Sequence, residues 1–213
     1  ICKKIYTYFV NPSIDTSHLN ELTDLFYKDY NIEKLMRHIF MSDWFYDENN
    51  IGAKIKSPVE LMVGIQKIVP SVFKKQRQVS YLQKMMGQIL LYPVNVAGWK
   101  GDRYWIDSNS LMFRLKLPSV LLNNANISLM PKGEFEDDFS DFYNQKSQQF
   151  KVSDQARAYF ETHYANISKE ELKAILVLPK LDQDTDEMLN IYQHQNAYQY
   201  CIQLMSIPEY QLC

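Results

Sequence analysis

The chain has 213 residues, 46% hydrophobic and 23% charged, a composition typical of a folded globular protein and unlike a disordered one. Its formal net charge is −2, and its densest basic cluster is only Lys74-Lys75-Gln76-Arg77, which disfavours nucleic-acid binding. No apolar run approaches the roughly 18 residues that a membrane-spanning helix needs, so no transmembrane segment is expected.

Helical spacing dominates the first part of the chain. Apolar side chains recur every three or four positions in three stripes. The stripes occupy residues 1–9 (Ile1, Ile5, Tyr8 and Phe9), 19–26 and 32–40. Asn11-Pro12 ends the first predicted helix, and Asn31 is the predicted N-cap of the third. The peptide at 42–50 then breaks the pattern.

The clearest helix start in the sequence lies at residue 57. Ser57 can cap, Pro58 takes the first helical position, and Glu60 can reach back to the cap. The residues that follow are apolar around most of the circumference, which predicts a central, buried helix. Gly64 weakens that helix by about 1 kcal/mol relative to Ala, a cost that close approach of a neighbouring helix would justify.

The next apolar stripe predicts a helix over residues 81–90. The segment 95–107 is not periodic, and its glycines and two tryptophans indicate an ordered loop. Helical spacing resumes at Ser108 and is predicted to end at Pro118.

Beyond residue 122 the pattern changes twice. Residues 123–150 are predicted to form an acidic and polar connecting region, with an acidic helix that carries Phe side chains on one face. Ser153 and Ser168 are predicted caps of two further helices, the second with a capping box, and a last helix is predicted from about Asp186 to Ser206. No stretch alternates with period two beyond a possible short hairpin.

These elements predict an all-α fold: an irregular, orthogonal bundle of about eight to ten helices with an ordered Trp/Gly loop at 95–107. Residues 1–122 are expected to form the helical core with this loop, and residues 151–213 to form C-terminal helices that pack back on it within one domain. The chain opens directly in a helix without Met, so we expect it to be a fragment of a longer protein.

The sequence offers no recognisable metal, cofactor or nucleophile motif. No His has a second ligand at the spacing of a known zinc or di-iron motif, which favours ordinary surface or capping histidines and no metal. The histidines are His18, His38, His163 and His194. Glycine-rich phosphate loops and the Gly-x-Ser-x-Gly elbow are missing, so no cofactor is expected.

The cysteine count is odd, and no two cysteines form a short-range pair. Cys2, Cys201 and Cys213 therefore do not indicate a disulfide framework, although one long-range bridge stays open. Free thiols, buried or terminal, are the favoured interpretation.

The loop at 95–107 is the first candidate binding site. Its aromatic and charged side chains could stack on sugar rings or grip a partner. The candidates are Trp99, Asp102, Arg103, Tyr104 and Trp105. The structural alternative, which we favour from sequence, is that both tryptophans anchor the loop on the helical core while Asp107 or Ser108 caps the next helix.

Two other groups could carry chemistry. Lys54, Lys56 and Ser57 could contact an anion at the helix start, although such lysines more often lie in water. In the acidic helix at 134–141, Asp137 and Asp141 could act as an acid and base pair, as in glycoside hydrolysis, but a solvated face is the more common outcome.

Several peptides carry a family resemblance. KKIYTYFV and LMRHIFMSDWFYD precede GAKIKSPVELMVGIQKIV, MGQILLYPVNVAGWKGDRYWIDSNSLMFRL and IQLMSIPEYQ. In this order they resemble the C-terminal half of the bacterial domain-of-unknown-function family 1800, over nearly the whole chain apart from residues 123–185. The resemblance implies a largely helical fold and no established activity, cofactor or catalytic residue. It also implies that full-length members commonly carry an export signal and are often encoded beside an exported protein of a second uncharacterised family, number 1501.

The resemblance and the residues together give two functional hypotheses. The first is a non-catalytic interaction or binding module, periplasmic, at the cell surface or secreted, whose partner is another exported protein or a polysaccharide. The Trp loop and the 15 tyrosines motivate it. The alternative is a carboxylate-dependent hydrolase acting on an envelope or extracellular glycan through Glu60, Asp102, Asp107 or the acids at 134–141.

Overall fold

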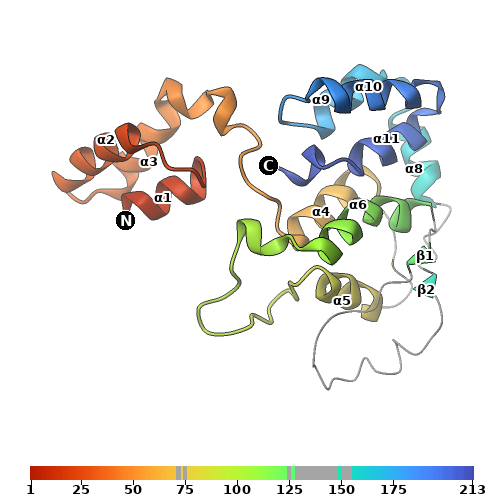
Figure 1. The fold of residues 1–213 in the computed structure, drawn as a ribbon, viewed down its shortest axis with the longest axis horizontal. Coiled ribbons are helices and arrows are strands. Elements are labelled where there is room, and N and C mark those ends of the chain that lie inside the picture. The colour runs from red at the N-terminus through yellow and green to blue at the C-terminus, as the bar shows by residue number, and fades with distance from the viewer. Residues whose placement is uncertain (71–72, 74–75, 124–125, 128–147, 150–154) are drawn as a thin grey trace.

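The computed structural model describes residues 1–70, 73, 76–123, 126–127, 148–149 and 155–213. Within these residues the chain forms ten α-helices and five 3-10 turns (Figure 1). One antiparallel pair of two-residue strands, β1 (Asn126–Ile127) and β2 (Gln148–Gln149), places Asn126 opposite Gln149. The predicted all-α, multi-helix fold is confirmed. No described helix is long and apolar enough to cross a membrane.

The first three helices pack around a hydrophobic core of their own, and we call residues 1–46 the N-terminal unit. It contains α1 (Cys2–Phe9), α2 (Thr16–Tyr27), α3 (Ile32–Met41) and the 3-10 turn η1 (Asp43–Tyr46). Its buried side chains are Cys2, Tyr6, Val10, Leu22, Phe26, Leu35 and Ile39. Asn31 accepts the N–H of Lys34 at 3.0 Å, which confirms the predicted cap of α3. Figure 1 shows this unit, in red and orange, to one side of the other helices.

A second and larger core lies in residues 57–213, which we call the body. Its helices are α4 (Pro58–Ile68), α5 (Gln76–Met85), α6 (Ser108–Leu122), α8 (Gln155–His163), α9 (Lys169–Leu176), α10 (Gln183–Ile191) and α11 (Ala197–Met205). The 3-10 turns are η3 (Asp102–Trp105), η4 (Tyr192–His194) and η5 (Glu209–Gln211). Leu61, Phe113 and Ile202 are fully buried, so α4, α6 and α11 meet at the centre of this core.

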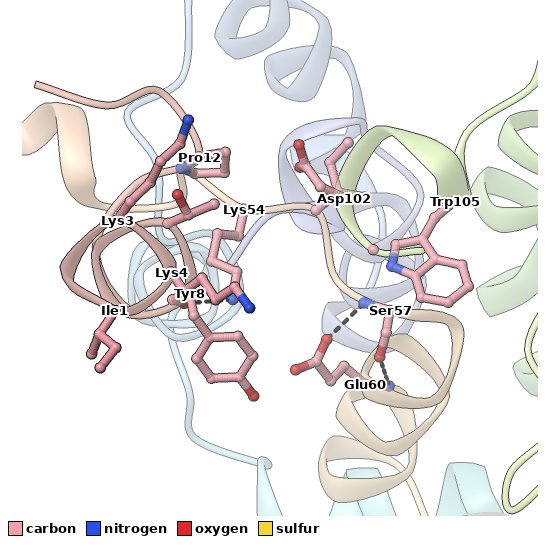
Figure 2. A pocket seen from close by; sticks show the side chains of 13 residues that line it. Ile1, Lys3, Lys4, Tyr8, Pro12, Lys54, Ser57, Glu60, Asp102 and Trp105 are labelled. Carbon is pink, nitrogen blue, oxygen red and sulfur yellow. Dashed lines mark hydrogen bonds between the residues drawn. The ribbon is translucent and has the colours of Figure 1, made fainter. Parts of the chain in front are cut away.

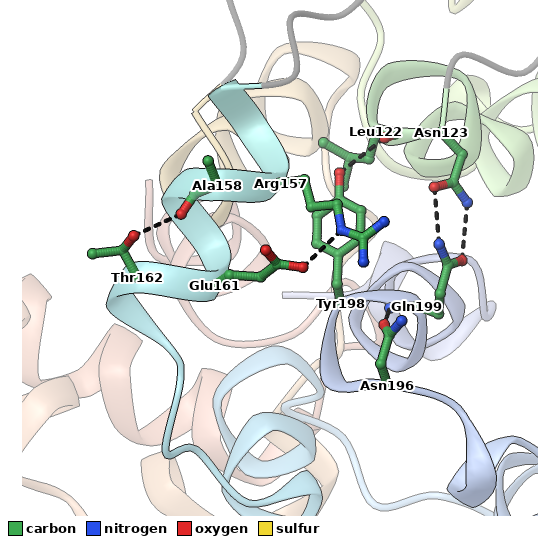
Figure 3. Close-up of polar contacts among 9 residues, drawn as sticks. All are labelled: Leu122, Asn123, Arg157, Ala158, Glu161, Thr162, Asn196, Tyr198 and Gln199. Atoms are coloured by element: carbon green, nitrogen blue, oxygen red, sulfur yellow. Dashed lines mark hydrogen bonds and ion pairs between the residues drawn. The ribbon is translucent and has the colours of Figure 1, made fainter.

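Polar contacts join the C-terminal end of α6 to the start of α11 (Figure 3). The buried Tyr198 hydroxyl donates to the Leu122 carbonyl at 2.8 Å, and burial raises the pKa of this phenol to about 12. Beside it, the side-chain amides of Asn123 and Gln199 exchange hydrogen bonds of 3.0 and 3.2 Å. These contacts satisfy groups at the C-terminus of α6 and hold α11 against it.

An extended linker, residues 47–56, connects the two units and contains the turn η2 (Glu48–Asn50). Ile55 pairs antiparallel with Leu212. The Lys54 N–H donates to the Cys213 carbonyl at 3.1 Å, the Cys213 N–H donates to Lys54 at 2.8 Å, and the Lys56 N–H donates to Gln211 at 2.7 Å. Backbone hydrogen bonds therefore attach the linker to the last residues of the body.

Arg114, on α6, braces this pairing from inside. Its side chain is 0% exposed; Nε donates to Gln211 Oε1 at 3.1 Å and Nη2 to the Lys56 carbonyl at 2.6 Å. Removal from water lowers the pKa of the guanidinium to about 10, still well above neutral pH. A buried cation thus links α6 to both strands of the pairing.

Two predicted helix ends are wrong, one because burial outweighed a local signal and one because a local signal was overlooked. The helix predicted to stop at Pro118 continues to Leu122. Proline destabilises a helix interior by about 3 kcal/mol. Burial of Val120, Leu121 and Leu122 beyond it stabilises the continued helix by about 1.5–3 kcal/mol for each side chain. The helix predicted over 81–90 ends at Met85.

Gly87 explains the early end of α5. At φ +87° it takes the left-handed conformation, the Gly87 N–H donates to Lys84, and the Gln88 N–H donates to Gln83. This pattern is a Schellman C-cap.

The predicted C-terminal helix is also wrong, because it is two helices. α10 ends at Ile191, the turn η4 follows, and α11 begins after Asn196. Asn196 has extended backbone and accepts the Gln199 N–H at 2.9 Å, so its side chain starts a new helix where the apolar spacing suggested continuity.

Some predictions fall outside the described residues. The acidic helix at 134–141, with Asp137 and Asp141, and the cap at Ser153 are among them. The domain boundaries predicted at 122 and 150 lie beside or within these segments and stay predictions.

The three cysteines are free thiols in the structure, as favoured from sequence. Cys201 is fully buried on α11, and burial raises its pKa to about 12. Cys2 is buried in the N-terminal unit, whereas Cys213 is exposed, with its pKa raised by partial burial and then by Glu60. Because the thiolate is the nucleophile and must be reached by the reagent, the exposed Cys213 should react with thiol reagents before the buried Cys2 and Cys201.

We predict that the folded chain reacts rapidly with one equivalent of an aromatic disulfide reagent, and with three when unfolded. Because the pKa of Cys213 is raised, the rapid phase should still be accelerating as the pH passes the ordinary thiol value of about 8.5. Cys213→Ser should abolish this phase. Rapid reaction of two thiols at pH 8 would contradict the packing.

Gly52 and Gly87 form a matched pair for a stability measurement, since both have positive φ. A Cβ at Gly87 meets nothing within 4 Å, whereas one at Gly52 would lie 2.9 Å from Pro179 Cβ and Cδ. Gly87→Ala should lower the free energy of unfolding by about 1 kcal/mol, from backbone strain alone. Gly52→Ala should lose a further 1–3 kcal/mol or so from the clash. Equal losses in urea unfolding would show that the linker does not press on Pro179.

Candidate functional site

A cleft of about 870 Å³ lies between the N-terminal unit and the body (Figure 2). α1 contributes one wall, including Lys3, Lys4 and Tyr8. The linker and the start of α4 contribute Lys54, Ser57 and Glu60. The turn η3 closes the other side with Asp102 and Trp105. Ligand sites commonly form at such junctions between units and have volumes in this range.

The wall on α1 exists because the helix buries a different stripe from the one predicted. The residues packed into the N-terminal unit are Cys2, Tyr6 and Val10. The predicted stripe is displaced: Ile1 and Tyr8 are 69% and 65% exposed. Their apolar surface therefore faces the cleft instead of a core. Both stripes have helical spacing, so the sequence pattern alone did not distinguish them.

Lys54 fixes the position of α1 beside the linker. Its Nζ donates to the Tyr8 carbonyl at 2.7 Å and lies 4.3 Å from the centre of the Tyr8 ring. Asn11 adds hydrogen bonds to the Asn49 carbonyl at 2.8 Å and to Asn50 Oδ1 at 3.0 Å. The C-terminal end of α1 is thus tied to the linker by four polar contacts.

The start of α4 is a complete capping box. The Ser57 N–H donates to Glu60 Oε2 at 2.7 Å, and the Glu60 N–H donates to Ser57 Oγ at 3.3 Å, as predicted. The Val59 N–H donates to Gln88 Oε1 at 3.1 Å and the Leu61 N–H to the Ser57 carbonyl. These amides already have acceptors, and Pro58 has no N–H group. An anion at the start of α4 would therefore depend on the lysine side chains.

The predicted anion group is divided by the structure. Lys54 and Ser57 line the cleft, but Lys56 does not. Lys56 Nζ donates to the Tyr210 carbonyl at 2.6 Å, 3.9 Å from the centre of its ring, and burial lowers its pKa. Tyr210 also explains Gly64, because a Cβ there would meet its hydroxyl at 3.3 Å.

The Trp loop is divided in the same way. Asp102 and Trp105 line the cleft, whereas Trp99, Arg103 and Tyr104 do not. The Trp105 side chain is only 8% exposed, and its carbonyl accepts the Ser110 hydroxyl at 3.0 Å.

The alternative interpretation of the loop, that its tryptophans anchor it on the helical core and that Asp107 or Ser108 caps the next helix, is confirmed for two residues. Trp105 anchors the turn on the body. Asp107 caps α6 by accepting the N–H groups of Asn109 and Ser110 at 2.7 and 2.9 Å. Trp99 is half-buried, while Arg103 and Tyr104 are exposed.

The two carboxylates of the cleft come from different elements. Glu60 points from the first turn of α4 toward α1 (Figure 2). Asp102 begins η3 with φ +58°, a left-handed conformation that few residues other than Gly, Asn and Asp adopt readily. With Lys3, Lys4 and Lys54 opposite, the cleft has a cationic wall and an acidic wall.

The described residues contain no group of three His, Cys, Asp or Glu side chains that could hold a metal ion. His38 Nε2 lies 2.6 Å from Glu21 Oε1 on the surface of the N-terminal unit. His18 stacks on Trp44 with ring centres 4.4 Å apart, and His163 stacks on Tyr159 at 3.8 Å. Each of these rings has a structural neighbour in its own unit.

The fold and the cleft define an all-α protein of two helical units with a mixed-charge groove at their junction. The chain belongs to the family described as Protein of unknown function (DUF1800), whose model matches residues 1–212. The match also includes residues 123–185, which the peptide resemblance does not cover. No curated protein and no solved structure matches the chain.

Proposed function

We propose that the chain is a non-catalytic binding module of an exported bacterial protein, acting in the cell envelope or the secreted fraction, and that its partner occupies the cleft. One observation carries the proposal: the cleft unites Lys54 and Ser57 with Asp102 and Trp105. These pairs come from two segments that the sequence predicts as candidate binding sites. Their convergence at the junction of two separate cores favours a ligand site over chance exposure.

The lining indicates the chemistry of the partner. Lys3, Lys4 and Lys54 give one wall a positive charge, and the 65% exposed ring of Tyr8 offers an apolar face beside them. An acidic polysaccharide matches this pair of features, because the C–H face of a sugar packs on an aromatic ring while its carboxylate meets the lysines. An acidic segment of another exported protein is the competing partner.

Charge reversal on the α1 wall tests this proposal. An acidic oligogalacturonide should bind the wild-type chain in titration calorimetry, and neutral maltohexaose should bind at least about tenfold more weakly. The double variant Lys3→Glu/Lys4→Glu should lose at least about tenfold in affinity for the acidic sugar, and Tyr8→Ala a similar factor.

The charge-matched control is Lys116→Glu/Lys180→Glu, which changes two exposed lysines that do not line the cleft and should bind like the wild type. Unchanged affinity in the α1 variants would refute the cleft as the site. Competition by an acidic peptide, without binding of either sugar, would assign the site to a protein partner.

A hydrolase acting on an envelope or extracellular glycan is the second candidate, favoured by the presence of both Glu60 and Asp102 in the cleft. Asp107 is excluded because it does not line the cleft; its carboxylate caps α6 instead. If the chain releases reducing ends from a bound glycan, Glu60→Gln and Asp102→Asn should each slow release by about a hundredfold or more while binding persists. Absence of any release by the wild type would leave the binding role alone.

A further inference from the structure

A second surface, outside the lining of the cleft, exposes several large apolar side chains close together in sequence. Residues 90–96, which we call the apolar loop, follow α5 and precede η3. Five of these seven residues are large, hydrophobic and exposed: Leu90 (53%), Leu91 (89%), Tyr92 (75%), Val94 (71%) and Val96 (109%). Figure 1 shows this yellow-green segment extending away from the helices of the body. None of the five lines the cleft.

The apolar loop has a defined conformation, because hydrogen bonds fix its backbone at both ends. The Tyr92 N–H donates to the Ile89 carbonyl at 3.0 Å, and the Leu90 N–H donates to Gln83 Oε1 at 2.9 Å. At the other end Asn95 accepts from the N–H groups of Ala97 and Gly98. The exposure therefore belongs to a defined turn.

The backbone conformation and the exposure of Leu91 are both unfavourable for the chain on its own. Its φ of +65° is a conformation that Gly or Asn adopts without difficulty and a leucine does not. The side chain is 89% exposed, so it gains almost no packing within the chain in return. A strained and solvated leucine at a turn tip indicates a contact outside the chain.

The charge of the sequence on either side of the apolar loop indicates the kind of contact. Between Glu60 and Asp102 the sequence contains no Asp or Glu, yet it contains six basic residues. They are Lys67, Lys74, Lys75, Arg77, Lys84 and Lys100. The whole chain has a net charge of −2, so the positive charge is concentrated in the segment that contains the apolar tip. Such a segment complements an anionic surface.

We propose that the apolar loop inserts into the interfacial region of an anionic lipid bilayer. The residue types of this segment match those of such an interface: aliphatic side chains at positions 90, 91, 94 and 96, the amphipathic rings of Tyr92 and Trp99, and the positively charged Lys100 next to Trp99. A single turn presents too little area for a stable protein interface of about 800 Å² per partner. A lipid surface needs only shallow insertion and adjacent positive charge.

The proposal is independent of the cleft and is tested with vesicles. The wild-type chain should sediment with vesicles of phosphatidylglycerol and phosphatidylcholine at least about tenfold more than with pure phosphatidylcholine, and raised salt should weaken the binding. Leu91→Asp/Val96→Asp should reduce the partition coefficient by at least about tenfold, since burial of two aliphatic side chains is lost.

The matched control is Met41→Asp/Ile191→Asp, which changes two side chains that are 79% and 73% exposed outside the apolar loop. It should partition like the wild type, and circular dichroism should show all variants folded. Trp99 offers a local readout: the emission shift on binding should disappear in Trp99→Phe.

Equal partitioning of the two double variants, or no preference for anionic vesicles, would overturn the proposal. So would sedimentation equilibrium showing that the wild type self-associates without lipid and that Leu91→Asp/Val96→Asp abolishes this, because the apolar loop would then join two copies of the chain.

Discussion

The antiparallel contact of residues 54–56 with residues 211–213 is the constraint on which the arrangement of this protein depends. Three backbone hydrogen bonds hold the linker, and the buried Arg114 donates to both strands at once. A buried guanidinium is expensive to desolvate, and its hydrogen bonds to Gln211 and the Lys56 carbonyl offset that cost only where both strands are in place. The brace therefore favours one register of the linker on the body.

The cleft follows from this register. Once Lys54 is fixed, its side chain can hold the end of α1 through the Tyr8 carbonyl, while the next residues begin α4 with the capping box of Ser57 and Glu60. The same short segment thus sets both walls. This accounts for the meeting of lysines from α1 with carboxylates from α4 and η3, although the two units bury separate cores.

Local chemistry could be predicted from the sequence, and long-range geometry could not. The caps at Asn31, Ser57 and Ser168 each need only a side chain within three residues of its target, and all three are confirmed. The Schellman end at Gly87 was equally local and was missed because apolar spacing was extended past a glycine. The α1 wall and the Lys54–Cys213 pairing join residues far apart in sequence, for which periodicity carries no information.

Hydrogen exchange at the amides of Lys54, Lys56 and Cys213 tests the central claim most directly. In the wild type these three amides should exchange as slowly as those of the body core, and together, because one pairing protects them. Arg114→Ala should release all three while the amides inside α2 and α3 stay protected. Exchange of the three amides at the rate of an open chain in the folded wild type would contradict the account.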